Sequence, residues 1–273
     1  MIETVTFAPK GRFGNTLFQY TAAKLLAHFL GAKVHNPLSP ADFHNIVAAE
    51  KHPVARPTRT IGDREFKSLL QHIGDGDAVA ELLNGGSRSL LCAGYFQYAW
   101  LLDKYQDIAR TFFTLANYET NDRDLAMHVR LGDFVFQRSN SGIIDYNWYV
   151  DILRQKSFGE LYIVTDRPKS SAEERYLRKF DEFNPTVVSN SPIDDFEFLR
   201  RFRKIILSNS TFSWWAAYLG AAEEIVLPEN YNHFGITRTG CHEHQEIHDV
   251  RGKGERIPCT FINIYERDLG QIK

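Results

Sequence analysis

The sequence predicts an α/β protein built on parallel sheets, and three observations indicate this fold class. Short apolar segments alternate with longer segments that carry the periodicity of amphipathic helices. Turns rich in glycine, serine or asparagine separate the two kinds of segment. The alternation opens the chain and restarts after residue 124. Such a pattern is typical of sheets whose parallel strands are joined by right-handed helical crossovers.

The composition is that of a folded globular protein with one or two domains. Of the 273 residues, 43% are hydrophobic and 24% are charged, which indicates neither disorder nor a coiled coil. The formal net charge of −2 provides no general field that would gather nucleic acid or an anionic membrane. We therefore expect no nucleic-acid partner, and we expect any anionic ligand to be bound locally.

The start of the chain predicts neither membrane insertion nor secretion. The apolar stretch at residues 21–30 is interrupted by Lys24 and His28, and it is much shorter than the ~20 residues that span a bilayer. The first residues lack the basic and apolar regions of a signal peptide. Three cysteines do not form a disulfide framework. We expect a cytoplasmic protein without stable membrane insertion.

The first elements read as strand, glycine turn, helix and strand. Residues 4–7 predict a short strand, and Gly11-Arg-Phe-Gly-Asn15 predicts a turn. Residues 17–30 follow with an apolar helical face, Gly31 ends that helix, and residues 32–34 start a second strand. This order predicts a βαβ unit at the start of the chain.

The remainder of the first half is less regular. Residues 36–86 are rich in proline and glycine and predict a loop-rich region that shapes an acceptor surface. Residues 90–98 predict a strand that leaves into a turn, and residues 101–113 predict a helix. The polar run 117–124 predicts a domain boundary. We expect domains at residues 1–120 and 121–273, with an irregular tail from residue 230.

The second half predicts a Rossmann-like domain in which strands and helices alternate regularly. Its predicted strands are residues 125–129, 161–165, 186–188, 204–207 and 224–227, and its predicted helices are residues 146–155, 171–180, 193–202 and 212–219.

Polar clusters follow three of these predicted strands. They are His128-Val-Arg-Leu-Gly-Asp133, Thr165-Asp166 and Ser208-Asn-Ser-Thr211. Wound parallel sheets bind ligands outside the carboxyl ends of their strands. Each cluster alone is also explained by the polar residues that cap helices, but the three together favour a ligand site.

The residue types in these clusters suit a nucleotide. His128 and Arg130 share a strand face, so both can point at one diphosphate, and arginine offers a planar fork to its oxygens. Ser210 or Thr211 can cap the next helix while backbone N–H groups face a phosphate. Asp166 is positioned to accept a hydrogen bond from a base or ribose.

Three other features allow simpler explanations. The turn at Gly11-Arg-Phe-Gly-Asn15 is either a tight turn before a helix or a backbone that faces a cleft between domains, because it fits neither a Walker loop nor a full dinucleotide fingerprint. Residues 241–248 contain Cys241, His244 and His248, but their spacing matches no zinc motif, so we expect a surface loop and no metal. Trp214 and Trp215 are assigned to a helix core.

Several segments match a known pattern in the same order. Gly11, Gly14, Asn15, Phe18, Gln19 and Tyr20 match Gly-x-x-Gly-Asn-x-x-Phe-Gln-Tyr, and Gly94-Tyr-Phe-Gln97 is similar to a second family segment. His128 to Asp133 match the nucleotide motif His-x-Arg-Arg-x-Asp, and residues 207–215 match Ser-Asn-Ser-Ser-Phe-Ser-Trp-Trp almost throughout. Together they resemble glycosyltransferase family 11, the α-1,2-fucosyltransferases.

The resemblance implies a GT-B fold, in which two Rossmann-like domains face a cleft, with the acceptor mainly on the first domain and the GDP-sugar on the second. It implies inverting, metal-independent transfer of fucose from GDP-fucose to a glycan hydroxyl, O-2 of a galactoside, without a cofactor. The residues implied in catalysis are Arg130, His128 and Asp133. Those implied in donor binding are Gly14, Asn15, His128, Arg130, Asp166, Ser208, Asn209, Ser210, Thr211 and Phe212.

One position departs from the pattern. Leu131 stands where the family usually has a second arginine, so the reaction must rely on Arg130, His128 or another basic group such as Arg12. Asp133 is the nearest candidate for a general base, or else it orients Arg130 or caps a turn. Two alternatives stay open: transfer from another nucleotide sugar, and a catalytically silent protein that binds a nucleotide or glycan. Acceptor, linkage and oligomeric state are not predicted.

Overall fold

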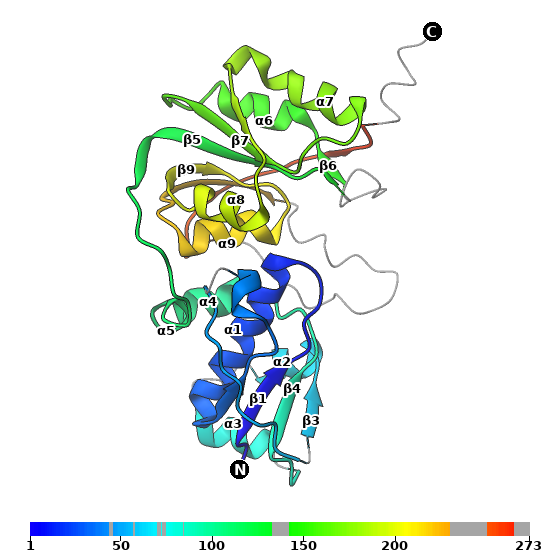
Figure 1. Ribbon diagram of the computed structural model, residues 1–273, viewed down its shortest axis with the longest axis vertical. Coiled ribbons are helices and arrows are strands. Elements are labelled where there is room, and N and C mark those ends of the chain that lie inside the picture. The colour runs from blue at the N-terminus through cyan, green and yellow to red at the C-terminus, as the bar shows by residue number, and fades with distance from the viewer. Residues whose placement is uncertain are drawn as a thin grey trace. The chain divides into compact units, whose positions relative to one another are not determined.

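The computed structural model describes residues 1–43, 46–56, 58–69, 72, 75–83, 85–132, 142–229 and 250–264. The chain divides into two compact units, of which the first comprises Met1–Asn117 and the second begins at Tyr118. Each unit contains a parallel sheet (Figure 1). None of the helices in the described ranges is long and apolar enough to cross a membrane.

The first unit is built on a four-stranded sheet in the order β2-β1-β4-β3, in which every pair is parallel. Its strands are β1 (Thr4–Phe7), β2 (Lys33–His35), β3 (Thr58–Ile61) and β4 (Ser89–Cys92).

The helix α1 (Phe13–Leu30) begins earlier than the predicted residue 17, so Gly14 and Asn15 belong to its first turn. Its predicted end at Gly31 is confirmed, because Gly31 adopts the left-handed conformation with a φ of 62° that favours glycine at a helix terminus. Buried aromatic and aliphatic side chains of α1 pack on β1, as the contact between the Tyr20 and Phe7 rings shows.

Residues 36–86 are more regular than the sequence predicts. Besides β3 they contain a 3₁₀ turn (Pro40–Phe43) and the short helices α2 (Asp63–Leu69) and α3 (Gly76–Leu82). Asp75 caps α3 by accepting hydrogen bonds from the backbone N–H groups of Asp77 and Ala78. Helices this short carry too few turns for a clear periodicity, so proline and glycine dominate the sequence signal.

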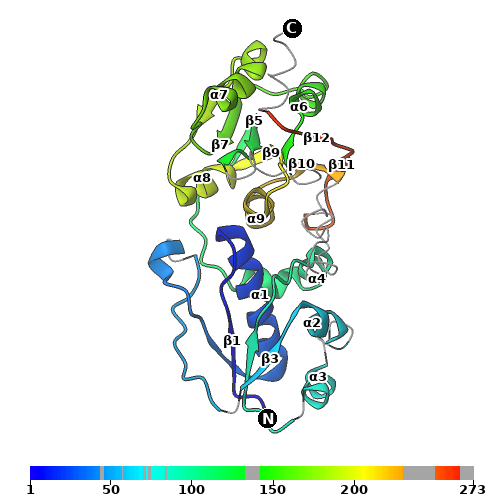
Figure 2. The ribbon, with the colours of Figure 1, turned by 90° about the vertical axis from the view of Figure 1, so that its right-hand side faces the viewer.

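The handedness of the connections decides which side of this sheet the helices cover. The steps from β1 to β2 and from β3 to β4 run in the same direction along the sheet, so right-handed crossovers place α1, α2 and α3 on one side. The contact between α1 and α3 agrees with this arrangement. The step from β2 to β3 runs the other way, so residues 36–56 cross the opposite side, as Figure 2 shows.

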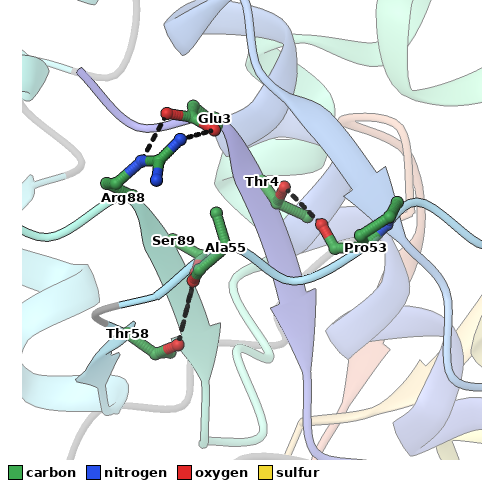
Figure 3. A network of polar contacts seen from close by, with 7 residues as sticks. All are labelled: Glu3, Thr4, Pro53, Ala55, Thr58, Arg88 and Ser89. Atoms are coloured by element: carbon green, nitrogen blue, oxygen red, sulfur yellow. Dashed lines mark hydrogen bonds and ion pairs between the residues drawn. The ribbon is translucent and has the colours of Figure 1, made fainter.

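This crossing segment is attached to the sheet by side-chain hydrogen bonds (Figure 3). The Thr4 hydroxyl on β1 donates to the Pro53 carbonyl at 3.0 Å, and the Ser89 hydroxyl on β4 donates to the Ala55 carbonyl. These contacts lie at the amino-terminal ends of the strands.

The second unit contains a six-stranded sheet in the order β11-β10-β9-β5-β7-β8, again with every pair parallel. Its strands are β5 (Asn121–Val129), β7 (Leu161–Thr165), β8 (Thr186–Val188), β9 (Phe202–Ile206), β10 (Glu224–Pro228) and β11 (Glu255–Ile257). Its helices are α6 (Tyr146–Leu153), α7 (Ser171–Leu177), η4 (Arg178–Phe183), α8 (Pro192–Leu199) and α9 (Thr211–Leu219).

Most of the predicted elements in this half are confirmed, and three differences along the whole chain are informative. The strand β5 begins at Asn121 rather than residue 125, because Asn121 already pairs with Phe202 of β9. The register between the two strands shifts between Asn121 and Leu125. The helix predicted at residues 101–113 is divided at Tyr105 into α4 (Ala99–Lys104) and α5 (Gln106–Arg110).

The third difference is in the tail. Beyond residue 249 the chain adds β11 to the edge of the sheet, and β12 (Phe261–Ile262) pairs antiparallel with β6 (Ile143–Ile144). The indole nitrogen of Trp148 also donates to the Ile257 carbonyl at 3.2 Å. Residues 250–264 are therefore part of the second unit, although the sequence predicts little order there.

Candidate functional site

The polar clusters of the second unit meet at one edge of its sheet. The strand β5 lies between β9 and β7, and all three run parallel, so their carboxyl ends share that edge. The cluster residues are His128 and Arg130 from β5 and its exit, Asp166 after β7, and Ser208 after β9.

His128 is buried beneath this edge. Its side chain is 4% exposed, its Nδ1 atom lies 2.7 Å from the Ser208 hydroxyl oxygen, and its ring is next to that of Phe212 at 5.5 Å. Burial, together with the nearby charge of Arg130, lowers the pKa of His128 from 6.5 to about 3. The imidazole is therefore neutral near physiological pH. Arg130 is then the charged member of this pair, and the catalytic role of His128 stays a prediction.

Arg130 carries the positive charge at this edge. Its Nη1 atom donates to Asp166 Oδ2 at 2.8 Å, and the two side chains are 12% and 35% exposed. Gly132 adjoins the pair with a φ of +63°, and a Cβ atom there would lie 3.1 Å from the same Asp166 oxygen. In this structure Asp166 accepts from Arg130, whereas the sequence suggested that it accepts from a base or ribose.

The third cluster forms the start of α9. Ser210 is the N-cap residue and accepts a hydrogen bond from the Phe212 N–H at 3.4 Å, while the Ser213 hydroxyl donates to the Ser210 carbonyl at 3.1 Å. Thr211 begins the helix and is 9% exposed. The N-terminus of a helix with this capping favours an anion, because its first N–H groups lack intrahelical acceptors.

Two buried polar atoms at this edge lack a hydrogen-bond partner in the described part of the chain. They are the side-chain oxygens of Asn209 and Thr165, although the Asn209 amide nitrogen donates to the Gly142 carbonyl at 3.0 Å. The sequence places Thr165 in a polar cluster with Asp166, at the end of a buried strand, but Thr165 was not among the predicted donor-binding residues.

Residues 207–215 also confirm one structural prediction. Trp214 and Trp215 are 0% exposed, and the Trp214 ring stacks on Tyr218 at 5.1 Å, so both tryptophans belong to the core. Leu131 is likewise 0% exposed in the core cluster of this unit, so the position that departs from the family motif is occupied by a packing residue.

Some predicted residues lie outside the described ranges. Asp133 and the Cys- and His-containing segment 241–248 are among them. Within the described ranges, no group of three or more His, Cys, Asp or Glu side chains could hold a metal ion.

In the first unit, the remaining predicted residues, Gly14 and Asn15, lie in the first turn of α1, where side-chain amides hold the chain on either side. The Asn15 side-chain oxygen accepts from the Gln97 amide at 2.8 Å. The buried Gln19 amide accepts from the Lys10 N–H at 2.9 Å and donates to the Lys10 carbonyl at 3.0 Å. Gly14 is buried in the first turn of α1. Gln97 belongs to a family motif but was not predicted as a site residue, because its contact with Asn15 joins residues 82 apart in the sequence.

Comparison with known proteins gives consistent matches. A family model described as glycosyl transferase family 11 matches residues 99–235. Galactoside alpha-(1,2)-fucosyltransferase 1 of Rattus norvegicus is 25% identical over 257 residues, which cover 82% of this chain and 65% of that protein. The enzyme of the same name from Mus musculus matches with the same identity and coverage, and that from Ateles belzebuth is 26% identical over 261 residues. The chain thus spans about 65% of the length of the rodent relatives.

A solved structure shows a similar fold. A mutant of Arabidopsis thaliana FUT1 in complex with GDP matches with a TM-score of 0.50 and 11% identity, over 85% of this chain and 72% of that one. Together with the two parallel sheets, this likeness confirms the predicted fold class, α/β of the GT-B type with two Rossmann-like units. That the units face a cleft stays a prediction.

Proposed function

The chain belongs to glycosyl transferase family 11, and we propose that it transfers fucose from GDP-fucose to a hydroxyl group of a glycan, O-2 of a galactoside. The proposed reaction is inverting and uses no metal ion. The family's relatives from rat and mouse are named galactoside alpha-(1,2)-fucosyltransferases, and the structural neighbour contains GDP.

One observation carries this proposal: a cation and a capped helix N-terminus lie at the carboxyl ends of β5, β7 and β9. When the acceptor hydroxyl attacks the sugar C1 atom, the bond from C1 to the diphosphate breaks and negative charge develops on the β-phosphate. Arg130 and the backbone N–H groups at Ser210 and Thr211 would stabilise that charge. Pre-oriented donors of this kind do not have to reorganise as the charge appears.

The neighbouring residues would keep these donors in place. Asp166 restrains the guanidinium of Arg130 through the 2.8 Å ion pair. His128, neutral and buried, restrains the Ser208 hydroxyl without adding charge. Asp133 remains a proposed base or a partner of Arg130, and the donor contacts of Gly14, Asn15, Asn209 and Phe212 remain predictions.

The burial of Leu131 favours a second candidate, transfer from a different nucleotide sugar. Its side chain packs in the core, so this position contributes no second cation to the diphosphate. All nucleoside diphosphate sugars share the diphosphate that Arg130 is proposed to contact. The preference for one donor over another therefore depends on contacts with its base and its sugar.

The discriminating experiment combines binding and transfer. Calorimetric titration with GDP, UDP and CDP is expected to show tight binding of GDP alone, and GDP-fucose is expected to be consumed in the presence of a galactoside from a glycan panel. Tighter binding of UDP or CDP would favour the second candidate. Binding of GDP without transfer to any acceptor would instead indicate a catalytically silent binding protein.

A further inference from the structure

The side of the first sheet that faces away from α1 carries an open cavity of about 830 Å³. Parallel sheets are usually covered by helices on both faces. Here the connection that crosses this side, residues 36–56, contains only the 3₁₀ turn in its described part. The cavity is lined by Thr6 of β1, Thr58 and Thr60 of β3, Leu91 of β4, and Val54 and Arg56 of the crossing segment.

The position of the crossing segment explains the space beside it. The segment is tied to the amino-terminal end of the sheet through Thr4 and Ser89, as Figure 3 shows. Side chains two residues further along parallel strands point to the same side. Thr6 and Leu91 therefore lie on the same side as Thr4 and Ser89, beyond the attachment, and Thr60 lies beside Leu91 on the next strand.

The polar groups around this cavity have unused hydrogen-bonding capacity. The Thr6 side chain is only 7% exposed, and its hydroxyl has no hydrogen bond with any described residue. Arg56 is exposed and has no ion pair with any described carboxylate. Two other arginines of this unit are paired, Arg59 with Glu65 at 3.4 Å and Arg88 with Glu3 at 2.6 Å. A nearly buried hydroxyl without a partner is unfavourable until a ligand or water bonds to it.

These groups define the chemistry of a ligand. Arg56 offers a planar, permanently charged fork that suits an anionic group. Threonine hydroxyls both donate and accept, as sugar hydroxyls require of their partners, while Val54 and Leu91 supply apolar contact. The volume is within the ~300–1,000 Å³ of small-molecule sites and far above the ~30 Å³ that one water occupies. None of the six described residues that line the cavity is aromatic, which disfavours a nucleobase.

We propose that this cavity binds an anionic saccharide, with Arg56 contacting its acidic group and the hydroxyls of Thr6 and Thr60 contacting its sugar hydroxyls. The acidic group is a carboxylate or a sulfate, since both present oxygens to the guanidinium fork. The site belongs to the first unit alone and is independent of the donor cluster, so it goes beyond the proposed transfer reaction.

The test is a calorimetric or NMR titration of the full chain with sialyllactose, sulfated lactose and neutral lactose, without GDP-fucose. At least one anionic saccharide should bind more tightly than lactose, and Arg56→Gln should weaken it at least tenfold. Thr60→Val should weaken it by a smaller factor. The two anionic ligands show whether a carboxylate or a sulfate is preferred, and binding of either supports the site.

Arg59→Gln is the matched control. Arg59 is on the same strand as Thr60, but its side chain points to the other side of the sheet and pairs with Glu65. This variant should bind as the wild type does. The proposal is overturned if neither anionic saccharide binds more tightly than lactose, if Arg56→Gln binds equally well, or if both arginine variants lose the same affinity. Because no transfer is measured, these outcomes do not depend on whether the chain is a fucosyltransferase.

Discussion

At the scale of single residues, burial changes what a motif residue can do. His128 follows the family pattern, yet its environment excludes water and places it beside Arg130, so its charged form is disfavoured. It acts as a hydrogen-bonding group for Ser208 rather than as a cation. Arg130, which is partly exposed at the same edge, carries the permanent charge of a guanidinium and pairs with the Asp166 carboxylate.

The buried histidine predicts a dependence of stability on pH. In the unfolded chain His128 binds a proton below pH 6.5, whereas in the folded chain its pKa is about 3. Its neutral form therefore stabilises the fold above pH 6.5, and this contribution is lost as the pH falls towards 3. The expected slope is at most about 1.4 kcal/mol per pH unit.

Urea unfolding between pH 7 and pH 4, followed by tryptophan fluorescence, measures this effect. In His128→Gln the free energy of unfolding should fall less steeply on acidification than in the wild type. His28→Gln, which changes an exposed histidine of α1, is the matched control. Identical slopes for the wild type and His128→Gln would show that His128 is not buried as a neutral group.

The charge of Arg130 predicts a loss of turnover on its removal. Arg130→Ala should lower the rate of transfer by about 10²–10³-fold, the usual effect of removing one donor that stabilises developing negative charge. The measurement is kcat with saturating GDP-fucose and a galactoside acceptor.

Arg154→Ala is the control for this substitution, since Arg154 pairs with Glu182 at 2.8 Å on the surface of the same unit. It should retain wild-type activity. Full turnover in Arg130→Ala would remove this residue from the proposed mechanism.

At the scale of elements, the N-terminus of α9 contributes to the stability of the fold and is also proposed to bind the diphosphate. Ser210→Ala removes its capping hydroxyl and should lower the free energy of unfolding by about 1 kcal/mol. It should also weaken GDP binding, because Ser210 holds the first turn of α9 in place and the backbone N–H groups at Ser210 and Thr211 are proposed to face the diphosphate.

Ser191→Ala separates the two effects. Ser191 caps α8 by accepting from the Asp194 N–H at 3.3 Å, at a helix start that is not assigned to the site. Its loss should lower stability by a similar amount without changing the Kd for GDP, as measured by calorimetry. Equal GDP affinities in the two variants would contradict the role proposed for the α9 N-terminus.

In the loop after β4, the backbone lies close to the carboxylate of Asp63. The Asp63 carboxylate accepts hydrogen bonds from the N–H groups of Tyr95 and Phe96 at 2.9 and 2.7 Å, and a Cβ atom at Gly94 would overlap that carboxylate. Phe96 adopts a φ of 53°, in the left-handed region that a non-glycine residue seldom occupies, so these bonds hold a strained turn.

Gly94→Ala should therefore destabilise the first unit by roughly 1–3 kcal/mol through overpacking. Gly62→Ala is its control, because a Cβ atom at Gly62 meets no atom within 4 Å. Urea unfolding followed by circular dichroism compares the two. Equal stability of the two variants would mean that the Asp63 side chain can move away from the added Cβ atom without a loss of free energy.

At the scale of the whole molecule, the order of the strands in each unit decides which edge or face of its sheet can bind a ligand. In the second unit, the parallel order brings residues far apart in sequence to a common edge. In the first, the direction of the crossovers gathers three helices on one side and leaves threonines and Arg56 on the other. Neither arrangement follows from any single segment.

The elements of the second half were largely predictable because each strand there is an apolar run between helices with clear faces. The strands at Leu161–Thr165 and Thr186–Val188 have the predicted bounds. The short strands at Glu255–Ile257 and Phe261–Ile262 were not predictable, since they are too short to show periodicity and are stabilised by pairing with distant strands.

By itself, the sequence determined the α/β class, most elements of the second half and the polar clusters at the strand ends, because periodicity and capping are local properties. Only the tertiary structure decided how those clusters are paired and charged. The His128–Ser208 contact joins residues 80 apart, and Arg130 meets Asp166 across 36 residues. The neutral state of His128 and the open polar face beside Arg56 arise from burial and chain crossing, which depend on neighbours distant in sequence and therefore on the complete fold.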